Sequence, residues 1–446
     1  MRFEVEEVRL EDHSQEAGAV ITPGGDIVVT DDGAGFSALI VKALSLRGYR
    51  ARLLGPNAIS EYSKSKDVRL DGLVLVAPAS SLEDTTIALD ALRWLRAAGP
   101  GLRQAGRTGP AALITISRLD GAFGLRNLST HPDPGAGGLA GLSKTAGREW
   151  PEVSCKAIDF DPALRLSDEA VTRLVDEILL PGPAEVGITA EGRNAPGLQR
   201  AEVAIANANA TPIQPGDVVV ITGGARGVTA EVAVALAEAF HPTLVLLGRT
   251  PSPHAEPPWL SPLEAESDIK RTLASQANGR ATPQLIGDQY TLIAANREIL
   301  RTLQRIEAAG GKALYRQVDV RDTQAVAATL TAVRRQYGPV RGLVHGAGVL
   351  ADRRIEDKTD EQFSIVYQTK VAGFHALLDA AGSDELRVIA VFSSTTARFG
   401  RTGQVAYAAA NEVLNKLAQR EARRRPSAVS SPSTGVLGTA AWSHPV

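Results

Sequence analysis

The sequence predicts an α/β fold of two tandem Rossmann-like units, each a doubly wound parallel sheet. Apolar strand-like runs alternate with amphipathic helix-like runs through most of the 446 residues, and this order is typical of parallel sheets covered by helices. The alternation occurs twice, from about 26 to 188 and again from 217 onward. The length is too great for one average domain and suits two. We place these two domains at 1–205 and 206–446.

In the first unit, the order of elements is regular but the first turn is unsuited to a nucleotide. We expect strands at 26–29, 70–76, 112–116 and 153–158, and helices at 36–47, 86–97 and 138–150. The turn after the first strand reads Asp31-Asp32-Gly33-Ala34-Gly35. Two carboxylates there would repel a pyrophosphate, which a helix N-terminus otherwise attracts. We therefore predict that this unit is degenerate, binds no cofactor and has a structural role.

The second unit repeats the alternation and adds an insertion. We expect strands at 218–221, 244–247, 313–318, 342–345 and 388–392, and helices at 228–240, 323–337, 361–381 and 405–424. The segment 251–288 opens with PSPHAEPPWLSP, which fits no regular element. We interpret it as a surface insertion after the second strand. The stretch 201–216 is small, polar and Pro-containing, which suits a linker or a crossing strand.

Composition excludes several classes of protein. The net charge is −2, so bulk charge favours neither a nucleic-acid nor a membrane partner. The single Cys155 excludes an internal disulfide and a thiolate metal cluster, and it fits a reducing compartment. No run approaches the roughly 18 apolar residues of a membrane span, and the acidic N-terminus is unlike a signal peptide. We expect a cytoplasmic protein without a bound metal.

A glycine-rich turn in the second unit is a candidate phosphate-binding site. Residues 218–228 read as strand, glycine turn and helix start, where backbone N–H groups and the helix N-terminus can bind a pyrophosphate. Taken alone, such a turn can also be purely structural. The candidate cofactor-binding residues here are Thr222, Gly223, Gly224, Arg226, Gly227 and Val228.

The ends of the next strands indicate which dinucleotide binds. The second strand ends in Arg249, where an acidic residue would bind the ribose of NAD and an arginine accommodates the 2′-phosphate of NADP. Arg226 can add a second positive charge, although Arg249 could also be a solvated arginine at a strand end. NADPH is therefore the predicted cofactor.

Two further strand ends complete the predicted cofactor site. Asp319, followed by Val320, can accept a hydrogen bond from the adenine amino group. His345 is interpreted as a packed or ribose-side residue. The small residues after it, which let the backbone pass close to the cofactor, are Gly346, Ala347 and Gly348.

Four residues form a candidate catalytic group for reducing a ketone. Ser394 follows the fifth strand, Tyr407 comes 13 residues later, Asn411 lies one helical turn beyond, and Lys370 precedes Ser394 by 24 residues. Hydride transfer to a ketone leaves negative charge on oxygen, which needs a proton. Tyrosine has a pKa of about 10, and a nearby ammonium lowers it.

We therefore assign the proton to Tyr407, the charge to Lys370 and oxyanion binding to Ser394. Asn411 would place Lys370 or a relay water. Each residue alone has an ordinary explanation, since a tyrosine on an amphipathic helix is usually core. The combination after an NADP-type turn favours a reductase.

These motifs resemble the short-chain dehydrogenase/reductase superfamily and, within it, ketoreductase domains of polyketide synthases. The matching pieces are TGGARG, LLGR, VDV, HGAGVL, KVAG, FSS and YAAAN. Asn411 stands where ordinary members carry the lysine, which here is Lys370 of KVAG; that exchange is typical of polyketide ketoreductases. ITGGARGVTAE, ANREI and ANEVLNK look most like polyunsaturated-fatty-acid and iterative synthases.

The resemblance implies a substrate, partners and a stereochemical outcome. The substrate would be a 3-ketoacyl chain on the phosphopantetheine arm of an acyl carrier protein, beside neighbouring synthase domains, and the product a 3-hydroxyacyl thioester. Asp352 matches the last residue of a Leu-Asp-Asp motif, and Phe399 replaces the tryptophan of the opposite class. We favour the 3R product, although Asp352 could be only a loop carboxylate.

Three departures from the family pattern stand out. Thr229 replaces the last glycine of the turn, and Ala351 interrupts the stereochemical motif. After Val436-Leu437, where we expect the next strand to begin, the segments of a substrate lid are missing. We expect either a fragment of a larger synthase or a truncated sequence, and in both cases a poorly active isolated chain. The alternatives are a non-catalytic structural module and a stand-alone reductase of free ketones.

Overall fold

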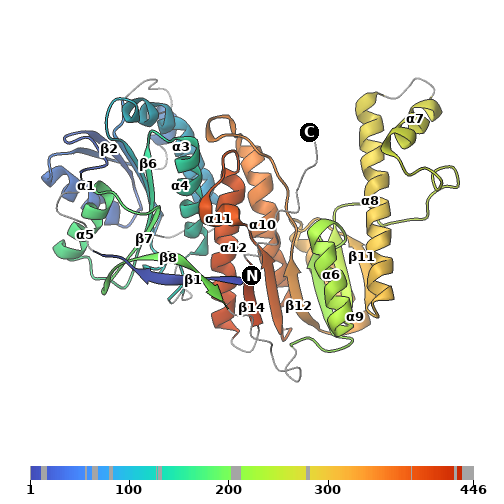
Figure 1. Ribbon diagram of the computed structural model, residues 1–446. Coiled ribbons are helices and arrows are strands. Elements are labelled where there is room, and N and C mark those ends of the chain that lie inside the picture. The colour runs from blue at the N-terminus through green and yellow to red at the C-terminus, as the bar shows by residue number, and fades with distance from the viewer. Residues whose placement is uncertain are drawn as a thin grey trace.

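The computed structural model describes residues 2–11, 18–55, 58–62, 69–79, 84–126, 128, 133–201, 212–277, 282–382, 384–425 and 429–433. Their strands form two sheets, each covered by helices, that lie side by side (Figure 1). This arrangement confirms the α/β class with parallel sheets.

The first sheet contains β1 (Arg2–Arg9), β2 (Asp26–Thr30), β3 (Arg50–Leu54), β4 (Gly72–Val76), β5 (Ala112–Ser117), β6 (Ser154–Phe160), β7 (Glu185–Thr189) and β8 (Gly192–Ala201). Its helical segments are α1 (Phe36–Leu46), α2 (Ile59–Tyr62), α3 (Asp84–Gly106), η2 (Pro134–Gly137), α4 (Gly138–Glu149) and α5 (Asp168–Leu179). The strand order is β1-β8-β7-β6-β5-β4-β2-β3, in which β2 to β7 are parallel and β1 and β8 are antiparallel additions.

The second sheet contains β9 (Val218–Thr222), β10 (Thr243–Gly248), β11 (Lys312–Gln317), β12 (Val340–His345), β13 (Val388–Phe392) and β14 (Val429–Ser433). Its helical segments are α6 (Gly227–Phe240), α7 (Glu266–Gln276), α8 (Pro283–Ala308), α9 (Thr323–Tyr337), η3 (Ile355–Asp357), α10 (Asp360–Ala381), α11 (Thr395–Phe399) and α12 (Val405–Arg424). The order β11-β10-β9-β12-β13-β14 is all parallel. It is the doubly wound order whose reversal point, between β9 and β12, forms a ligand crevice at the carboxyl ends of the strands.

The two sheets differ in strand order. The parallel strands of the first sheet run in the flavodoxin-like order, with one strand fewer beyond β2 than the second sheet has beyond β9. Sequence patterning missed β3, whose RARLL carries two charged residues, and β8, whose GRNAPGLQRA contains a proline. The polar composition of both strands conceals the period of two that indicates a strand.

The expected insertion between β10 and β11 is more ordered than its sequence suggested. It contains α7 and the start of α8, a helix of 26 residues whose first turn is capped by Thr282. The α7 helix and the beginning of α8 project from the second unit (Figure 1), while the later part of α8 packs on α6 and β11. The opening stretch, 251–265, contains no helix or strand, while the middle of the segment is helical in α7, as its polar composition allowed.

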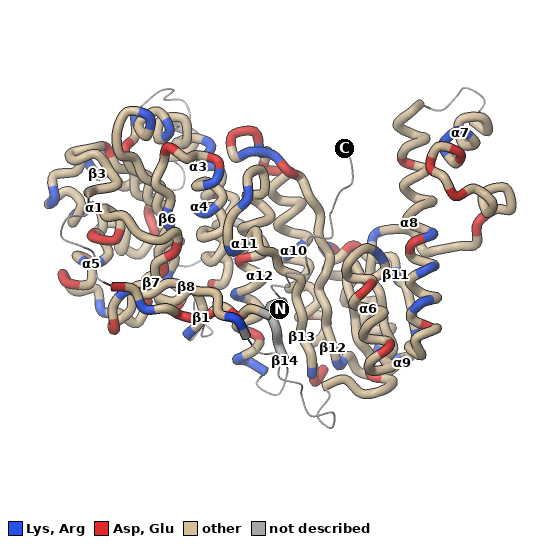
Figure 2. The backbone as a smooth tube through the Cα atoms, viewed as in Figure 1, with Lys and Arg blue, Asp and Glu red and all other residues tan. Residues whose placement is uncertain are grey.

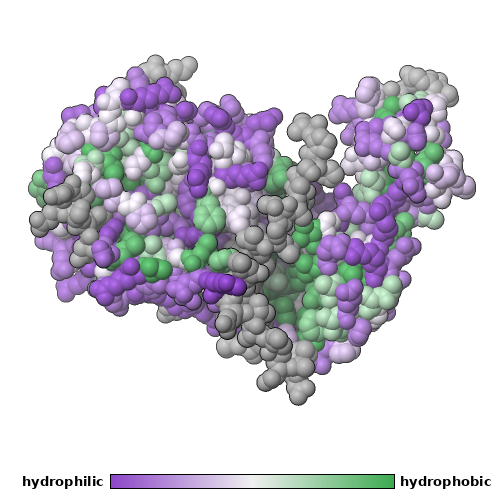
Figure 3. Space-filling model, in the orientation of Figure 1, coloured by the Kyte–Doolittle hydropathy of each residue, from purple (hydrophilic) through white to green (hydrophobic). Residues whose placement is uncertain are grey.

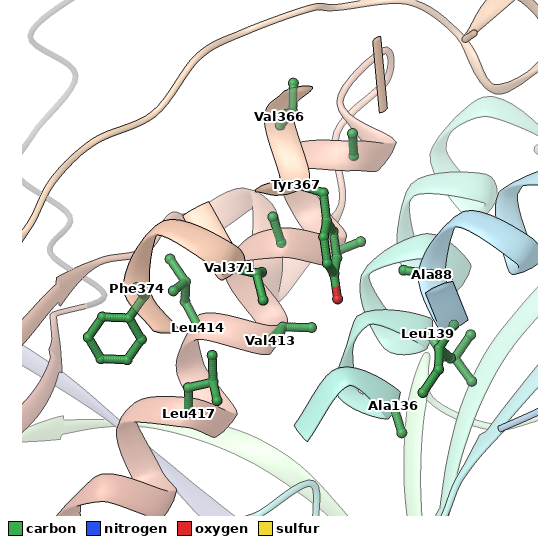
Figure 4. Packing of buried hydrophobic residues seen from close by; sticks show 14 of the residues in the cluster. Ala88, Ala136, Leu139, Val366, Tyr367, Val371, Phe374, Val413, Leu414 and Leu417 are labelled. Carbon is green, nitrogen blue, oxygen red and sulfur yellow. The ribbon is translucent and has the colours of Figure 1, made fainter. Parts of the chain in front are cut away.

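One apolar core joins the two units. Helices α3 and α4 of the first unit pack on α10 and α12 of the second. Figure 4 shows Tyr367 and Val413 on one side of this contact, facing Ala88, Ala136 and Leu139 on the other, and all five residues belong to one buried cluster. The helices of the second unit that carry the candidate residues Lys370 and Tyr407 are therefore held in place by the first unit.

The surface carries mixed charge. Acidic and basic residues alternate over both units (Figure 2), and hydrophilic residues predominate on the face shown in Figure 3. Within the described residues, no helix has the length and apolar character needed to cross a bilayer. In the same residues, no cluster of three or more His, Cys, Asp or Glu side chains could hold a metal ion.

The C-terminal expectations fall mostly beyond these residues. The sixth strand, β14, is Val429–Ser433, which is earlier than the Val436-Leu437 start that we expected. Residues 434–446, on which the missing-lid expectation rests, and 202–211 of the linker lie outside the described residues.

Candidate active site

The turn after β9 is built to approach the turn after β12. Gly223 has φ +69°, and a Cβ atom there would lie 3.1 Å from the carbonyl carbon of Gly346. The Gly346 N–H donates to the Thr222 carbonyl (3.1 Å), and the Ala347 N–H donates to Thr222 Oγ1 (3.2 Å). These bonds bring Thr222 and Gly223 together with Gly346 and Ala347 at the reversal point of the sheet, which is where folds of this kind bind ligands.

His345 is a packed residue at this junction. It is fully buried, and burial lowers its pKa to about 3, so the imidazole is neutral. Its Nε2 lies 2.9 Å from the Lys370 carbonyl oxygen and therefore carries the proton. The Thr222 hydroxyl then donates to His345 Nδ1 (2.8 Å). His345 thus links β9 and β12 to the backbone of α10 at Lys370.

The Thr229 departure is compensated locally. A Cβ atom at Gly346 would lie 2.5 Å from Thr229 Oγ1. The glycine at 346 therefore makes the room that the usual glycine at 229 would otherwise supply, and α6 packs against β12 with the threonine in place.

The N-terminus of α6 carries a carboxylate that sequence analysis did not foresee. Glu298 on α8 accepts a hydrogen bond from the Gly227 N–H (2.8 Å) and pairs with Arg226 Nε (2.9 Å). Arg226, expected to supply a second positive charge, is thus paired with an exposed carboxylate in this structure. Glu298 stands in the ANREI motif, but nothing in the pattern indicated that it would reach this turn.

The remaining predicted cofactor residues lie at the same edge of the sheet. Arg249 is exposed, and its charge contributes to lowering the pKa of Asp319, so the two side chains are close. The main cause of that lowered pKa is Arg321, whose Nη2 lies 2.6 Å from Asp319 Oδ2. In this structure the Asp319 carboxylate is therefore paired with the guanidinium of Arg321. Val320 is buried against Gly373 of α10. A Cβ atom added to Gly373 would lie 2.8 Å from a methyl group of Val320.

Lys370 is a buried cation beside the tyrosine. It is 2% exposed, and its Nζ donates to the Phe392 carbonyl (2.9 Å) and lies 5.2 Å from the centroid of the Tyr407 ring. A Cβ atom on Gly348 would lie 3.3 Å from its Cε. Burial lowers the pKa of Lys370 to about 8. The structure thus brings Lys370, Tyr407 and Gly348 together, with the amine over the ring face.

The expected lowering of the Tyr407 pKa is wrong. Burial raises the pKa of its phenol, the negative field of Asp352 raises it further, and a contribution from Asn411 only opposes these effects. The Lys370 cation faces the ring, which is a favourable cation–π contact, and burial is the largest cause of the raised pKa of the hydroxyl. At neutral pH Tyr407 therefore holds its proton.

Ser394 and Asn411 lie on the elements that flank this pair. Ser394 caps α11, and its Oγ accepts from the Thr396 N–H (3.1 Å), which leaves the hydroxyl proton available for a substrate oxygen. Asn411 Nδ2 donates to the Tyr407 backbone carbonyl (2.8 Å). Its Oδ1 is buried and has no hydrogen-bond partner among the described residues, so it can accept from a water.

Of the two candidate stereocontrol residues, Asp352 lies on a loop near Tyr407 and Phe399 is the last residue of α11. Asp352 is exposed, and its Oδ2 accepts from Nε2 of the buried Gln404 (2.9 Å). The Phe399 side chain is 48% exposed, while its carbonyl accepts from Arg148 Nε of α4 (3.0 Å). Gln404 was missed from the sequence, although its position three residues before Tyr407 could have drawn attention to it.

Comparisons with known proteins show which family and which relatives the chain resembles. Residues 217–434 match the model of the KR domain family. The chain is 34% identical over 331 residues to a polyunsaturated fatty acid synthase of Thraustochytrium sp., which covers 69% of this chain and 12% of that protein. It is 26% identical over 451 residues to polyketide synthase ThaG of Burkholderia thailandensis, which covers 96% of this chain and 7% of that protein. The chain thus spans a small part of these relatives.

Solved structures share the fold. A structure of A-type ketoreductases from a modular polyketide synthase aligns with a TM-score of 0.71 at 21% identity, covering 97% of this chain and 82% of that one. A ketoreductase domain from the bacillaene assembly line aligns with a TM-score of 0.62 at 20% identity, covering 96% and 82%. The match extends over both units, so the first unit is part of the shared architecture.

Proposed function

Because residues 217–434 of this chain belong to the KR domain family, we propose that the chain reduces a 3-ketoacyl thioester with NADPH. The substrate would be carried on the phosphopantetheine arm of an acyl carrier protein within a polyketide or polyunsaturated-fatty-acid synthase. The observation that carries this proposal is the buried Lys370 amine against the Tyr407 ring, at the carboxyl edge of a nucleotide-type sheet.

The cofactor site fits a dinucleotide phosphate. A Cβ atom on Gly227 would meet nothing within 4 Å, so a pyrophosphate has room beside the start of α6 and would take the place of the exposed Glu298 carboxylate at the Gly227 N–H. Arg249 is exposed and has no hydrogen-bond or ion-pair partner among the described residues, which suits a 2′-phosphate. The residues that would hold NADPH are Thr222, Gly223, Gly224, Arg226, Gly227, Val228, Arg249, Asp319, Val320, Gly346, Ala347 and Gly348.

The four catalytic candidates then divide the reaction. NADPH, when bound, supplies the hydride that forms the new C–H bond at the ketone carbon. Tyr407 gives its proton to the oxygen, and the raised pKa keeps that proton in place until an alkoxide, a much stronger base, develops. Ser394 donates a hydrogen bond to that oxygen. Lys370 stabilises the phenolate left behind, and Asn411 Oδ1 can hold the water that returns a proton.

The boundary between the units is part of the same proposal. We propose that 1–205 is a structural unit without a cofactor and that 206–446 is catalytic. The 3R outcome, with Asp352 and Phe399 as the residues that orient the ketone, also belongs to it. Asp352 lies on a loop and bonds to Gln404 at the start of α12, and Phe399 ends α11 and bonds to Arg148 of α4 through its carbonyl.

The decisive test is the Tyr407→Phe variant. We expect reduction of a carrier-bound 3-ketoacyl substrate to fall about 10³-fold because the proton donor is lost, while NADPH binding is retained. Tyr367→Phe is the matched control, since Tyr367 is a fully buried core tyrosine on α10, and it should keep most of the activity. NADPH oxidation, product analysis and cofactor titration measure these effects.

The same assay separates the alternatives. A wild-type chain that binds NADPH but reduces neither the carrier-bound substrate nor a decalone would be a structural module. Reduction of the free ketone with no preference for the carrier-bound form would indicate a stand-alone reductase. Unchanged turnover in Tyr407→Phe would remove the assigned acid.

A further inference from the structure

Glu149, the last residue of α4 in the first unit, makes its hydrogen bonds in the second unit. Its Oε2 accepts from the Ile355 N–H (2.8 Å) and its Oε1 accepts from the Gly403 N–H (2.7 Å). The residue is 6% exposed. Burial raises the pKa of this carboxyl, and the two backbone donors oppose that effect. One side chain therefore joins two separate segments of the other unit.

Both of these segments are connected to Tyr407. The first, 350–358, contains Asp352, and the second, 400–404, leads directly into α12. The Arg353 N–H donates to the Gly403 carbonyl (3.0 Å), so the segments are also bonded to each other. Gly403 has φ +80°, a turn that leaves its N–H pointing to Glu149. Asp352 is close enough to Tyr407 to influence the pKa of its phenol.

A second buried side chain strengthens the same junction. Lys358 is 2% exposed, and its Nζ donates to the carbonyl oxygens of Ala351 and Gly403. Glu149 thus takes the N–H of Gly403 and Lys358 takes its C=O. Because both the N–H and the C=O of Gly403 are hydrogen-bonded, the 400–404 turn has little freedom to move relative to the 350–358 segment.

We propose that Glu149 is a positioning residue that fixes the two segments around the ketone and so controls the rate and the face of hydride transfer. This inference rests on the proposed reduction, since it concerns the same site. It gives the first unit a part in the reaction beyond support. A rigid pair of loops matters because a shift of about 1 Å in a reacting group can cost as much as 10²-fold in rate.

The chemistry of the junction requires a carboxylate. Two N–H groups from different segments converge on one side chain, and only an ionised carboxylate offers an acceptor to each. A glutamine would keep one acceptor and present its own N–H₂ to the other donor. Leaving a buried donor unsatisfied is costly, so one of the segments would have to move.

The test compares Glu149→Gln with Glu177→Gln. Glu177 is a matched control because it is 1% exposed and its bonds to Lys156 and Arg193 stay within the first unit. For each variant, we would measure kcat, KM for NADPH, the ratio of the two product enantiomers from a prochiral ketone, and residue-resolved hydrogen exchange.

For Glu149→Gln we expect kcat to fall about 10-fold, the enantiomer ratio to move toward equality, and KM for NADPH to stay unchanged. The amides of Ile355 and Gly403 should exchange faster, by about 10-fold or more, because their acceptor is lost. Glu177→Gln should keep the wild-type enantiomer ratio and the protection of both amides even if it lowers the melting temperature.

Two results would overturn the inference. One is a Glu149→Gln variant with wild-type kcat, enantiomer ratio and amide protection. The other is an equal loss in Glu177→Gln, which would mean that any weakening of the first unit has this effect. If the wild type reduces no ketone, the proposed function fails, whereas the exchange rates at Ile355 and Gly403 still decide whether Glu149 fixes the segments.

Discussion

The first helices of the two units, α1 and α6, both follow a glycine-containing turn, and each has a carboxylate at its N-terminus. At α1 this is Asp32, which is 3% exposed and accepts from the Ser37 N–H (3.0 Å), while Ser37 Oγ accepts from the Asp32 N–H (3.0 Å). At α6 it is Glu298, whose side chain is 40% exposed and comes from α8. The first carboxylate is built into the turn, and the second is brought by a separate helix.

This difference shows how a nucleotide fold can differ in function without a change in architecture. The Asp32 carboxylate occupies the N-terminus of α1, where a phosphate would otherwise bind, and two reciprocal hydrogen bonds with Ser37 hold it there. Glu298 is exposed and hangs on a flexible side chain, so a pyrophosphate or 2′-phosphate can displace it. The comparison supports the proposal that only the second unit binds NADPH.

The units nevertheless depend on each other through a buried charge network. Lys144 of α4 is bonded to Glu185 of β7 (2.7 Å) and to Glu412 of α12 (2.5 Å), and the exposure of all three side chains is 3%. Glu412 follows the catalytic candidate Asn411. The network therefore couples the fold of the first unit to the helix that carries Tyr407.

The largest stability effect should come from breaking this network with Lys144→Ala. The change removes one of two cations from each buried carboxylate, since Glu412 keeps Lys416 and Glu185 keeps Arg398. The cost should therefore approach but not exceed the roughly 3–5 kcal/mol of a fully broken buried pair. Urea unfolding, followed by fluorescence, should show a lower midpoint for one transition that includes both units, because they share a core.

Lys270→Ala serves as the control, because Lys270 pairs with Glu266 on the exposed α7. It should change the free energy of unfolding by less than about 1 kcal/mol. Two separate transitions in the wild type, or equal effects of the two variants, would contradict this view of the units as one cooperative structure.

The next prediction concerns pH and belongs to the second unit alone. The Lys370 amine faces the Phe392 carbonyl of β13 and the Tyr407 ring of α12, with neutral His345 on β12 and Asp352 on the nearby loop. Because burial lowers the pKa of Lys370 to about 8, the amine loses its charge above that pH. We expect kcat/KM for ketone reduction to fall about tenfold per pH unit there.

The sign for stability is opposite to that for activity. A folded-state pKa below the usual value means that the charged amine disfavours the folded protein, and this penalty disappears as the pH rises from about 8 toward the unfolded value of about 10.5. Lys370→Met should therefore raise stability at pH 7 and abolish reduction. A pH–rate profile that stays flat to pH 10 would contradict the assignment.

Local sequence signals predicted most of the second unit, and long-range contacts account for what they missed. Helices at 323–337 and 405–424 and the strand at 388–392 have the predicted bounds, because each carries a clear apolar period. Lys370, Tyr407 and Gly348 were predicted to share one site, and they lie together because their motifs stand on neighbouring elements of the second sheet. Glu149 and Glu298 act at sites far along the chain, and no local pattern indicates where a long carboxylate will reach. The Tyr407 pKa depended on burial and ring geometry, which spacing does not give.

The smallest expected effect tests the two helix N-termini directly. Glu298→Gln removes the negative charge from the start of α6 and frees Arg226, while Asp32→Asn makes the equivalent change at α1. Charges at a helix N-terminus are worth about 0.3–1 kcal/mol, so Glu298→Gln should tighten NADPH binding about 2–5-fold, and the gain should shrink as salt screens it. It should be larger for NADPH than for NADH, because Arg226 becomes available to the 2′-phosphate.

Asp32→Asn should leave the NADPH affinity unchanged, because its turn lies in the other unit, and should only weaken the first unit by loss of the bond to Ser37. Fluorescence titration of both variants at two salt concentrations decides the matter. If Glu298→Gln weakens binding, Glu298 supports the turn and does not compete with the cofactor. If Asp32→Asn creates a second NADPH site, the first unit has been kept empty by that one carboxylate. The two N-termini would then differ only in the side chain that occupies them.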